Sequence, residues 1–299
     1  MKLLISIFHY IGCQINLLAF WLLKNQKSRM NAHEIDYRIF GEEMQFVEIE
    51  LDPNETVIAE PGSMLMMDEE IEMATIFGDG SKEDEQKSFM GKVWSAGKRM
   101  ISGEKLFMTA FTHEGIGKKT VSFASPYPGK IIPLDLSKYE GKVVCQKDAF
   151  LCAAKGARVG IEFSRKLGRG FFGGEGFIMQ KIEGDGMAFL HAGGYIIEKR
   201  LEAGEHLRVD TGCLVGFTKD VDYDIQMVKG VRNMVFGGEG MFFASLIGPG
   251  NVWIQTLPIS RLSDRILSHA KGYGKIGSSG GEGSILGGLG DLIDGDGIF

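Results

Sequence analysis

Cysteine and proline are scarce in this sequence, with 4 and 7 among 299 residues. Four cysteines are too few to staple a scaffold of this length by disulfides, so buried apolar surface must stabilise the fold. Basic residues do not dominate either, because the formal net charge is -6. This argues against a general nucleic-acid binder, which usually has a basic face and a high pI. The free thiols suit a reducing compartment.

Metal-ligating patterns are missing as well. The cysteines include no C-x-x-C pair, and the 6 histidines are scattered singly, without an H-x-x-x-H or H-E-x-x-H pair. Scattered histidines are typical of partly buried structural residues. The sequence therefore predicts no metal site and no cofactor.

Glycine is abundant instead, with 43 residues, about twice its usual share of roughly 7%. Collagen is excluded because no G-X-Y period runs through the chain, and global disorder because 44% of the residues are hydrophobic. The composition predicts a globular protein rich in turns, with one large or two ordinary domains.

The first 29 residues need a separate interpretation. Residues 3–23 form an uncharged apolar run, about the ~20 residues of a membrane-spanning helix, interrupted by His9, Gln14 and Asn16. The segment either tethers the body to a membrane, with the body in the cytoplasm, or precedes a true start at Met30 of a soluble cytoplasmic protein. We favour the second interpretation, because Gln14 and Asn16 would enter hydrocarbon unpaired.

A glycine–glutamate motif occurs three times along the chain. Each copy is followed by an apolar run, a Gly-rich turn (114–117, 184–186 and 248–250) and a second β-type run, which predicts a hairpin. The motif residues are Gly103, Glu104, Gly173, Gly174, Glu175, Gly176, Gly237, Gly238, Glu239 and Gly240.

A second shared segment lies upstream of each hairpin. Residues 57–65 match residues 207–215, and residues 144–152 form the middle copy, with Ala149 where the others have Gly62 and Gly212. The first copy carries about 15 extra residues before its motif, which the polar stretch 78–87 accommodates as a solvated loop. Three such units predict an all-β fold, a sandwich or roll with pseudo-threefold repetition.

One helix is predicted, from Ser260 to His269, with Leu262, Ile266 and Leu267 on one face. Beyond Gly272 the chain becomes rich in Gly and Ser, which is typical of a flexible tail. The predicted organisation is an apolar segment 1–29, a three-repeat β domain 30–259, and a helix with a tail 260–299.

Four strings in order carry a family resemblance: Y-R-I-F-G at 37–41, M-Q-F-V-E-I-E-L at 44–51, E-P-G at 60–62 and G-G-E-G at 237–240. Over roughly residues 32–258 the chain resembles the altered inheritance of mitochondria protein 24 family. The resemblance implies a fold similar to the tryptophan RNA-binding attenuator protein, a β-roll that is a short double-stranded β-helix, and no established catalysis. Fungal members are linked to mitochondrial inner-membrane organisation, and bacterial members have no assigned activity.

Several strings resemble catalytic motifs but lack the context that gives such motifs their function. The G-x-G-x-x-G strings at 168–173 and 272–277 do not lie between a buried strand and a helix. The G-x-S-x-G string at 277–281 lies in the tail, where no strained nucleophile elbow can be held. None of them is predicted to be a site.

A basic run stands out in the acidic chain: Lys155, Arg158, Arg165, Lys166 and Arg169. It is a candidate anionic-ligand patch, for RNA with neighbouring aromatic rings as stacking partners or for a phosphate-rich membrane surface. We favour a solvated face that balances nearby acids, because the whole chain is acidic. Nucleic acid is therefore not the expected partner.

The function predicted from the sequence is a non-enzymatic scaffold or binding module, in a homo-oligomer that covers exposed β-roll edges. An enzyme with its site in a roll cavity normally needs two or three histidines and a carboxylate, and no histidine pair shares a strand. Glu104, Glu175 and Glu239 are expected in equivalent surroundings, each accepting backbone N–H bonds. A three-carboxylate cation site is the alternative.

Overall fold

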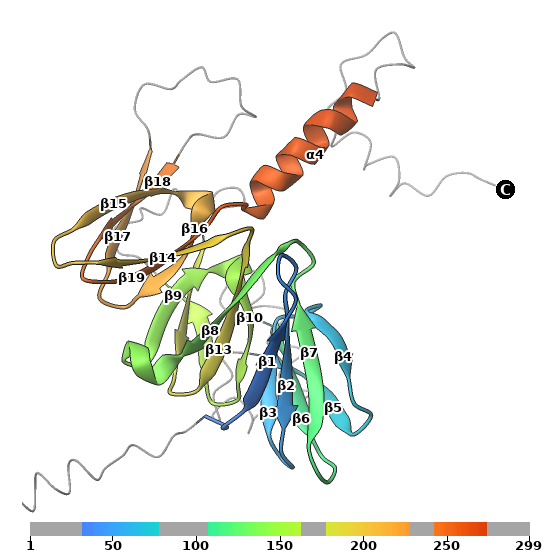
Figure 1. The fold of residues 1–299 in the computed structure, drawn as a ribbon. Helices are drawn as coiled ribbons and strands as arrows, with labels where there is room; N and C mark the ends of the chain where they lie inside the picture. The colour runs from blue at the N-terminus through green and yellow to red at the C-terminus, as the bar shows by residue number, and fades with distance from the viewer. Residues whose placement is uncertain (1–31, 78–106, 163–177, 228–241, 274–299) are drawn as a thin grey trace, which may run out of the picture. The chain divides into compact units, whose positions relative to one another are not determined.

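The computed structural model describes residues 32–77, 107–162, 178–227 and 242–273 of the chain (Figure 1). These residues form antiparallel β-sheets followed by one helix, α4 (Ile259–Tyr273). The predicted all-β fold with one C-terminal helix is therefore confirmed. The chain divides into two compact units after Pro258, and the sheets belong to the first.

The first two sheets contain four and six strands, in which neighbouring strands pair side by side. Sheet I has the order β1 (Asp36–Phe40), β2 (Phe46–Leu51), β7 (Lys119–Ala124), β4 (Met64–Met67). Sheet II has the order β5 (Ile71–Phe77), β6 (Phe107–His113), β3 (Thr56–Ala59), β10 (Phe150–Ala154), β13 (Met187–Gly193), β8 (Gly129–Asp135).

The other two sheets contain six and three strands. Sheet III has the order β11 (Arg158–Ile161), β12 (Met179–Glu183), β9 (Lys142–Gln146), β16 (Leu214–Thr218), β19 (Gly250–Gln255), β14 (Ile196–Leu201). Sheet IV has the order β15 (His206–Asp210), β18 (Phe242–Ile247), β17 (Asp222–Met227). In the described ranges, three short 3-10 turns connect strands: Leu136–Tyr139, Lys147–Ala149 and Thr211–Cys213.

The strand pairing follows one order three times, in modules that span residues 46–124, 129–193 and 196–255. In each module of six strands, the fourth, fifth and second strands pair side by side, and the first, sixth and third strands form the other half. Neighbouring modules are joined because the second strand of one pairs with the third strand of the next. These junctions are β3 with β10 and β9 with β16.

The predicted hairpins at the Gly-rich turns are wrong. Each turn joins the fifth and sixth strands of a module, and these strands lie in different sheets, as β6 and β7 do. The turn is therefore a corner between sheets. Glycine suits it because Gly184 and Gly250 have φ of +151° and +145°. A strand–turn–strand pattern does not reveal whether its two strands pair with each other or with others.

The sequence match of the middle copy is also shifted by one residue. Ala59 lies opposite Cys152, and Cys145 lies opposite Gly216, so the ladders align Cys145 with Ala59. Three residues after Ala59 and Cys145, Asp148 rather than Ala149 corresponds to Gly62. The sequence match aligned Ala149 with two glycines because all three side chains are small. The true register is fixed by backbone hydrogen bonds between strands.

Three apolar cores separate the four sheets. The first core lies between sheets I and II, the second between sheets II and III, and the third between sheets III and IV. Sheets II and III are therefore covered on both faces, and all five residues of β10 and of β16 are buried. Continuous apolar runs such as F-L-C-A-A in β10 suit strands covered on both faces.

The second compact unit contains helix α4, which matches the predicted helix at residues 260–269. Ile266 and Leu267 are exposed on this helix. No helix in the described ranges is both long and apolar enough to cross a membrane. The predicted apolar segment 3–23 and the Gly-rich tail lie outside the described residues.

Candidate functional site

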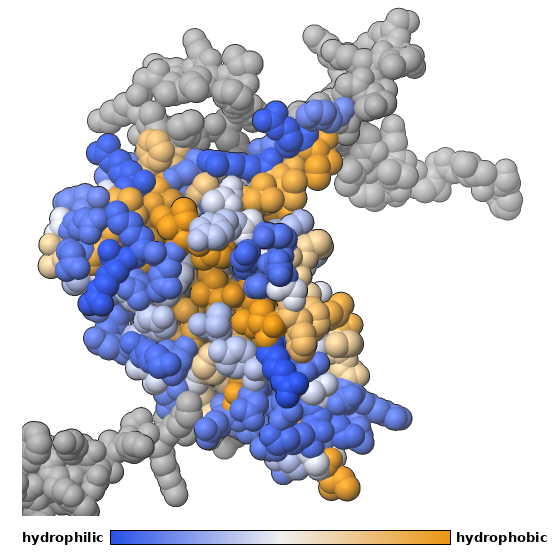
Figure 2. All heavy atoms as spheres, in the orientation of Figure 1, coloured by the Kyte–Doolittle hydropathy of each residue, from blue (hydrophilic) through white to orange (hydrophobic). Residues whose placement is uncertain are grey.

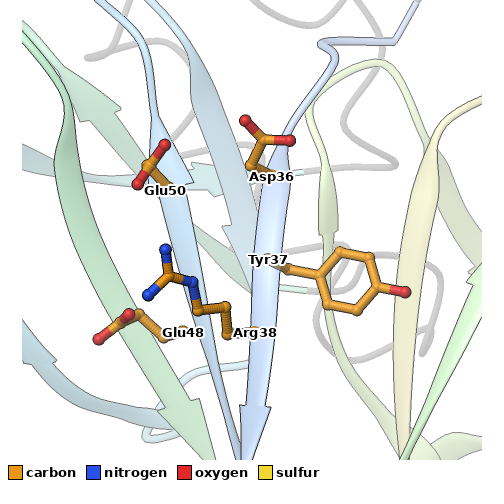
Figure 3. A pocket seen from close by; sticks show the side chains of 5 residues that line it. All are labelled: Asp36, Tyr37, Arg38, Glu48 and Glu50. Atoms are coloured by element: carbon orange, nitrogen blue, oxygen red, sulfur yellow. The ribbon is translucent and has the colours of Figure 1, made fainter.

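The surface formed by the described residues of the first unit includes two hollows. The first, of about 250 Å³, is lined by Asp36, Tyr37 and Arg38 of β1 and by Glu48 and Glu50 of β2 (Figure 3). The Arg38 guanidinium lies over β2 between the two glutamates in this view. Three carboxylates and one guanidinium give an acidic, open surface without a nucleophile beside a base, so the hollow does not have the parts of a hydrolytic site.

The second hollow, of about 270 Å³, lies beside β9 and the turn that precedes β17. Its lysines are paired with acids: Lys142 Nζ lies 3.0 Å from a Glu162 carboxylate oxygen, and Lys219 forms an ion pair with Glu140. The bond to Glu140 raises the pKa of Lys219 above its usual value. Paired charges of this kind balance one another at the surface and leave little net attraction for an anion.

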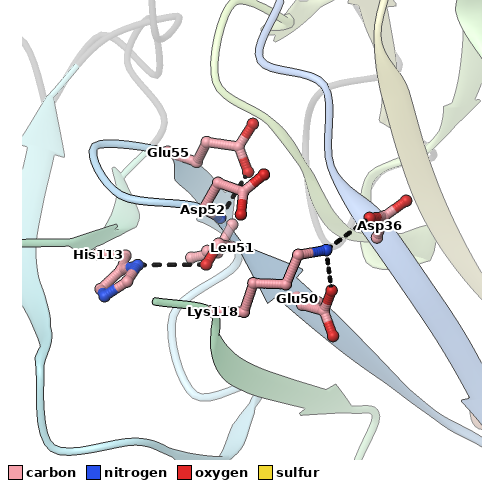
Figure 4. A network of polar contacts seen from close by, with 7 residues as sticks. All are labelled: Asp36, Glu50, Leu51, Asp52, Glu55, His113 and Lys118. Atoms are coloured by element: carbon pink, nitrogen blue, oxygen red, sulfur yellow. Dashed lines mark hydrogen bonds and ion pairs between the residues drawn. The ribbon is translucent and has the colours of Figure 1, made fainter. Parts of the chain in front are cut away.

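A network of polar contacts ties the start of β1 to the corner between β6 and β7 (Figure 4). Lys118 donates hydrogen bonds to Glu50 and to Asp36, and these bonds raise the pKa of its ammonium. On the other side of the corner, the His113 ring nitrogen Nδ1 lies 3.2 Å from the Leu51 carbonyl. The network connects strands that are distant in sequence, which is a structural task.

Two titratable groups, the buried His191 and the half-buried Glu60, lie near the junction of the first two modules. Burial lowers the pKa of His191 on β13 to about 4 and raises the pKa of Glu60, the residue directly after β3, to about 7, with a contribution from Asp148. The Tyr127 ring packs edge-on against the His191 ring, with centroids 4.6 Å apart. Within the described residues, His191 Nδ1 has no hydrogen-bond partner.

The cysteines of sheets II and III are not suited to act as nucleophiles or metal ligands. Cys145 and Cys152 are fully buried, and burial raises the pKa of both thiols far above the usual value. A thiol that stays protonated is a poor nucleophile and a poor metal ligand. Among the residues that the structure describes, no group of three His, Cys, Asp or Glu side chains could hold a metal ion.

The candidate residues from the sequence are only partly placed by the structure. Lys155 is half-buried in the turn after β10, and Arg158 is exposed on β11. Arg165, Lys166 and Arg169 lie outside the described residues, as do all ten residues of the glycine–glutamate motif. The three segments that carry the motif each connect the fourth and fifth strands of a module. The expectations for Glu104, Glu175 and Glu239 therefore stay predictions.

An exposed apolar strand is the feature that the sequence reasoning missed. All four residues of β4 are exposed: Met64 by 37%, Leu65 by 54%, Met66 by 50% and Met67 by 37%. We call these four residues the β4 strip. In Figure 2, pale orange apolar surface lies along the right-hand edge, where Figure 1 places β4. The signal was the run M-L-M-M itself, which lacks the polar alternation of a half-solvated strand.

The β4 strip lies at the end of sheet I, where the strand has β7 on one side and no second partner among the described strands. An edge strand offers unpaired backbone N–H and C=O groups, which soluble proteins usually protect with charge, proline or a bulge. β4 has a bulge between Met64 and Met66 but no charged residue and no proline. Methionine is also common at binding surfaces because its flexible side chain adapts to its partner. The strip therefore combines free backbone groups with an adaptable apolar surface.

Comparison with known proteins identifies the family. The model of the mitochondrial biogenesis AIM24 family matches residues 37–257. The chain belongs to the AIM24 family. An uncharacterized protein of Streptococcus pyogenes serotype M6 is 30% identical over 244 residues, which is 80% of this chain and 92% of the relative.

A solved structure supports the fold of this AIM24-family chain. The X-ray crystal structure of a protein from Streptococcus pyogenes aligns with a TM-score of 0.61 at 23% sequence identity, covering 79% of this chain and all of the other. This likeness shows the fold alone. The resemblance read from the sequence is thus confirmed, and the relative described above is itself uncharacterized.

Proposed function

We propose that this AIM24-family chain is a non-enzymatic scaffold or binding module that docks a protein partner on the β4 strip. The observation that carries the proposal is the exposure of all four apolar residues of an edge strand. Exposed apolar groups that lie together are typical of interaction sites, whereas single exposed ones are ordinary. Added-strand binding uses the backbone for affinity and alternate side chains for specificity.

Three described side chains of chemically reactive types support a structural role. The Cys145 and Cys152 thiols and the His191 imidazole are buried, and burial disfavours the charged form of each. A general base or a nucleophile must reach its substrate. These three side chains instead pack in or beside the apolar cores.

A complementation experiment tests the proposal in a host whose own copy of the gene is deleted. We expect full-length chains with His191→Phe or Cys152→Ala, melting within a few degrees of the wild type, to restore growth or morphology. Met66→Lys should fail, whereas the matched control Met73→Lys, which changes a methionine 48% exposed on β5, should succeed. Loss of function in folded His191→Phe with full function in Met66→Lys would overturn a non-enzymatic role.

Membrane association belongs to the same proposal, through residues 3–23 or through a basic patch near anionic headgroups. Fractionation of native cells, followed by intact-mass analysis of the chain, tests it. A chain that begins at Met1 and is recovered with membranes supports a tether. A chain that begins at Met30 and is recovered in the soluble fraction contradicts it and supports the cytoplasmic form.

The second candidate is a nucleic-acid or small-ligand binder that uses the basic run at 155–169. Its support is the exposed position of Arg158 on β11, at the end of sheet III. If RNA binds there, Arg158→Ala should weaken binding and reduce the slope of log affinity against log salt by about 1. A labelled RNA titrated at several salt concentrations measures this slope, and an unchanged slope removes Arg158 from the interface.

A further inference from the structure

Helix α4 carries its apolar residues on one side. Ile259, Leu262 and Ile266 recur at spacings of three and four residues, which places them on one face of the helix, and Leu267 widens that face. We call these four residues the α4 apolar face. Figure 2 shows orange hydrophobic surface along α4 beside blue hydrophilic surface. The helix is therefore amphipathic.

Most of the α4 apolar face is exposed. Ile266 is exposed by 60%, Leu267 by 54% and Ile259 by 38%. A single exposed apolar residue is ordinary, whereas several on one face of a helix are typical of a contact surface. Water is a poor neighbour for these side chains, so the face is suited to an apolar partner.

A row of basic residues borders the α4 apolar face. Arg261, Arg265 and His269 recur every four residues, so they follow one line along the helix, next to the line of Leu262 and Ile266. Arg261 and Arg265 are exposed. An arginine at the border of an apolar face can bury its aliphatic stem while its guanidinium stays in a polar layer. The partner of α4 is therefore expected to be apolar with an anionic border.

The charge of α4 is opposite in sign to the charge of the rest of the chain. The helix contains three basic residues, Arg261, Arg265 and Lys271, and one acid, Asp264, so its net charge is +2. The whole chain carries -6, and the residues outside α4 therefore carry -8. An anionic surface attracts the helix and repels the remainder of the chain, which orients the protein with α4 at that surface.

We propose that α4 binds flat on the surface of an anionic lipid bilayer, with the α4 apolar face in the outer acyl region and Arg261 and Arg265 at the lipid phosphates. Helices of this kind bind through buried apolar area together with attraction to anionic lipids. This inference rests on the membrane association in the proposed function, because it names the element that contacts the membrane and the lipid chemistry that it recognises.

The length of α4 suits a helix that lies on a membrane, not one that crosses it. Its 15 residues extend about 22 Å, whereas the hydrocarbon core of a bilayer is about 30 Å thick. A crossing helix would also bring Arg261, Asp264 and Arg265 into hydrocarbon. In a helix parallel to the surface, these charges stay at the level of the headgroups while the apolar face is buried about 5–10 Å deep.

Pairing between the α4 helices of two copies suits this sequence less well. A two-stranded coil that uses the α4 apolar face as its seam places His269 at the next seam position. Arg265 would flank the seam in both helices, and the one acid of the helix, Asp264, lies on the outer side. A second α4 therefore offers no anionic group to the arginines, whereas lipid phosphates do.

A polarity-sensitive fluorophore on α4 tests the inference in the full-length chain. Cys13 and Cys213 are replaced by serine, and the label is attached at Ile266→Cys, because Cys145 and Cys152 are fully buried and do not react. We expect the emission to shift to the blue when vesicles that contain phosphatidylglycerol are added. Vesicles of phosphatidylcholine alone should leave the emission unchanged, since a short helix needs the attraction of its arginines to anionic lipid.

The matched control carries the same label at Asp264→Cys, which is exposed on the polar side of the same helix. A label at this position should keep the emission of a fluorophore in water with both kinds of vesicle, because the polar side faces away from the bilayer. Equal blue shifts at Ile266→Cys and Asp264→Cys would contradict a helix that lies flat with one face buried.

The contribution of the arginines is measured with the label at Ile266→Cys in a chain that also carries Arg261→Gln and Arg265→Gln. We expect this chain to need at least about tenfold more anionic lipid for half of the blue shift. Arg200→Gln with Arg208→Gln makes the same change of charge at exposed positions of the first unit and should leave the requirement unaltered. Equal losses in the two chains would show that net charge, not α4, governs binding.

Two further outcomes overturn the inference. A label at Ile266→Cys that is blue-shifted before vesicles are added shows that the protein itself covers the face. A label that anionic vesicles do not shift excludes lipid and leaves an acidic protein as the partner of α4. If fractionation nevertheless recovers the chain with membranes, the membrane association of the proposed function survives through residues 3–23. A chain recovered only in the soluble fraction contradicts both.

Discussion

The third strands of the three modules hold equivalent places in their sheets and have opposite environments. β10 and β16 are buried along their whole length, whereas β4 is exposed along its whole length. The side chains of β4 are no less apolar than those of the other two. The difference therefore arises from the neighbouring strand: β10 and β16 each pair with a strand of the preceding module, whereas no module precedes β4 among the residues that the structure describes. The third strand is apolar in every module, and whether its side chains are buried depends on the strand that pairs with its outer edge.

The largest expected effect compares one residue type in the two environments. Leu151→Ala removes a side chain that fills the first core, and we expect it to lower the free energy of unfolding by about 2–4 kcal/mol. Leu65→Ala, at the equivalent place on β4, should change it by no more than about 0.5 kcal/mol. Urea denaturation measures both.

The comparison with Leu65→Ala must be made at a protein concentration low enough for separate chains. If the unfolding midpoint of this variant falls as far as that of Leu151→Ala under those conditions, β4 is covered within its own molecule. A shift that appears only at higher concentration instead indicates a cover from a second copy.

His191 offers a test of the junction between the first two modules through pH. Burial lowers the pKa of its imidazole from the usual 6.5 to about 4. Between these values the unfolded chain binds a proton that the folded chain does not, so stability falls as the pH decreases from about 6.5 to 4. We expect this group to cost about 2–3 kcal/mol across that window.

His191→Phe keeps an aromatic ring against Tyr127 and cannot be protonated. Urea titrations at several pH values should therefore show a shallower loss of stability in acid for this variant than for the wild type. Equal slopes in the two proteins would mean that the His191 ring is accessible to solvent.

The fold class and the helix could be predicted from the sequence, whereas the strand pairing could not. The Gly-rich turns and the alternating strand patterns predicted an all-β chain, and the spacing of Leu262, Ile266 and Leu267 predicted helix α4. The hairpins were wrong because a local turn pattern carries no information about which strands pair. Pairing between modules depends on contacts about 90 residues apart, as between Ala59 and Cys152.

The candidate site was harder to predict than the fold. The run M-L-M-M at 64–67 reads as a buried strand, and only the sheet order shows that its outer side has no partner among the described strands. The candidates predicted from the sequence were charged side chains, in the basic run and the glycine–glutamate motif, because such residues bind ligands. Most of them lie outside the described residues. Exposure depends on the whole assembly of strands, which no local spacing encodes.

Glu60 should show the opposite pH dependence from His191 at the same junction. Burial, with a contribution from Asp148, raises the pKa of the Glu60 carboxyl from 4.5 to about 7. In this window the folded chain holds a proton that the unfolded chain has lost, so stability falls as the pH rises from about 4.5 to 7. The carboxyl is partly solvated, which limits the effect to about 1–2 kcal/mol.

Glu60→Gln replaces the residue by its counterpart in the second module, Gln146, since the strand ladders align Ala59 with Cys145. The variant should be more stable than the wild type at pH 8 and nearly equal to it at pH 4. Thermal melts at the two pH values compare the proteins. A variant that loses stability at pH 8 would show that the carboxylate is stabilised by a partner, contrary to its raised pKa.

The smallest expected effect concerns Ser122, which stands on β7 where the other modules have Phe189 and Trp253. Ser122 is 1% exposed, and its hydroxyl has no hydrogen-bond partner within the described residues. A buried hydroxyl without a partner loses its hydration without compensation, so removing it is neutral or favourable. We expect Ser122→Ala to raise the free energy of unfolding by about 0.5–1 kcal/mol, measured by urea denaturation. A loss of more than about 1 kcal/mol would show that the hydroxyl is hydrogen-bonded in solution, and that this face of sheet I is organised by a polar contact instead of by the apolar packing seen in the other two modules.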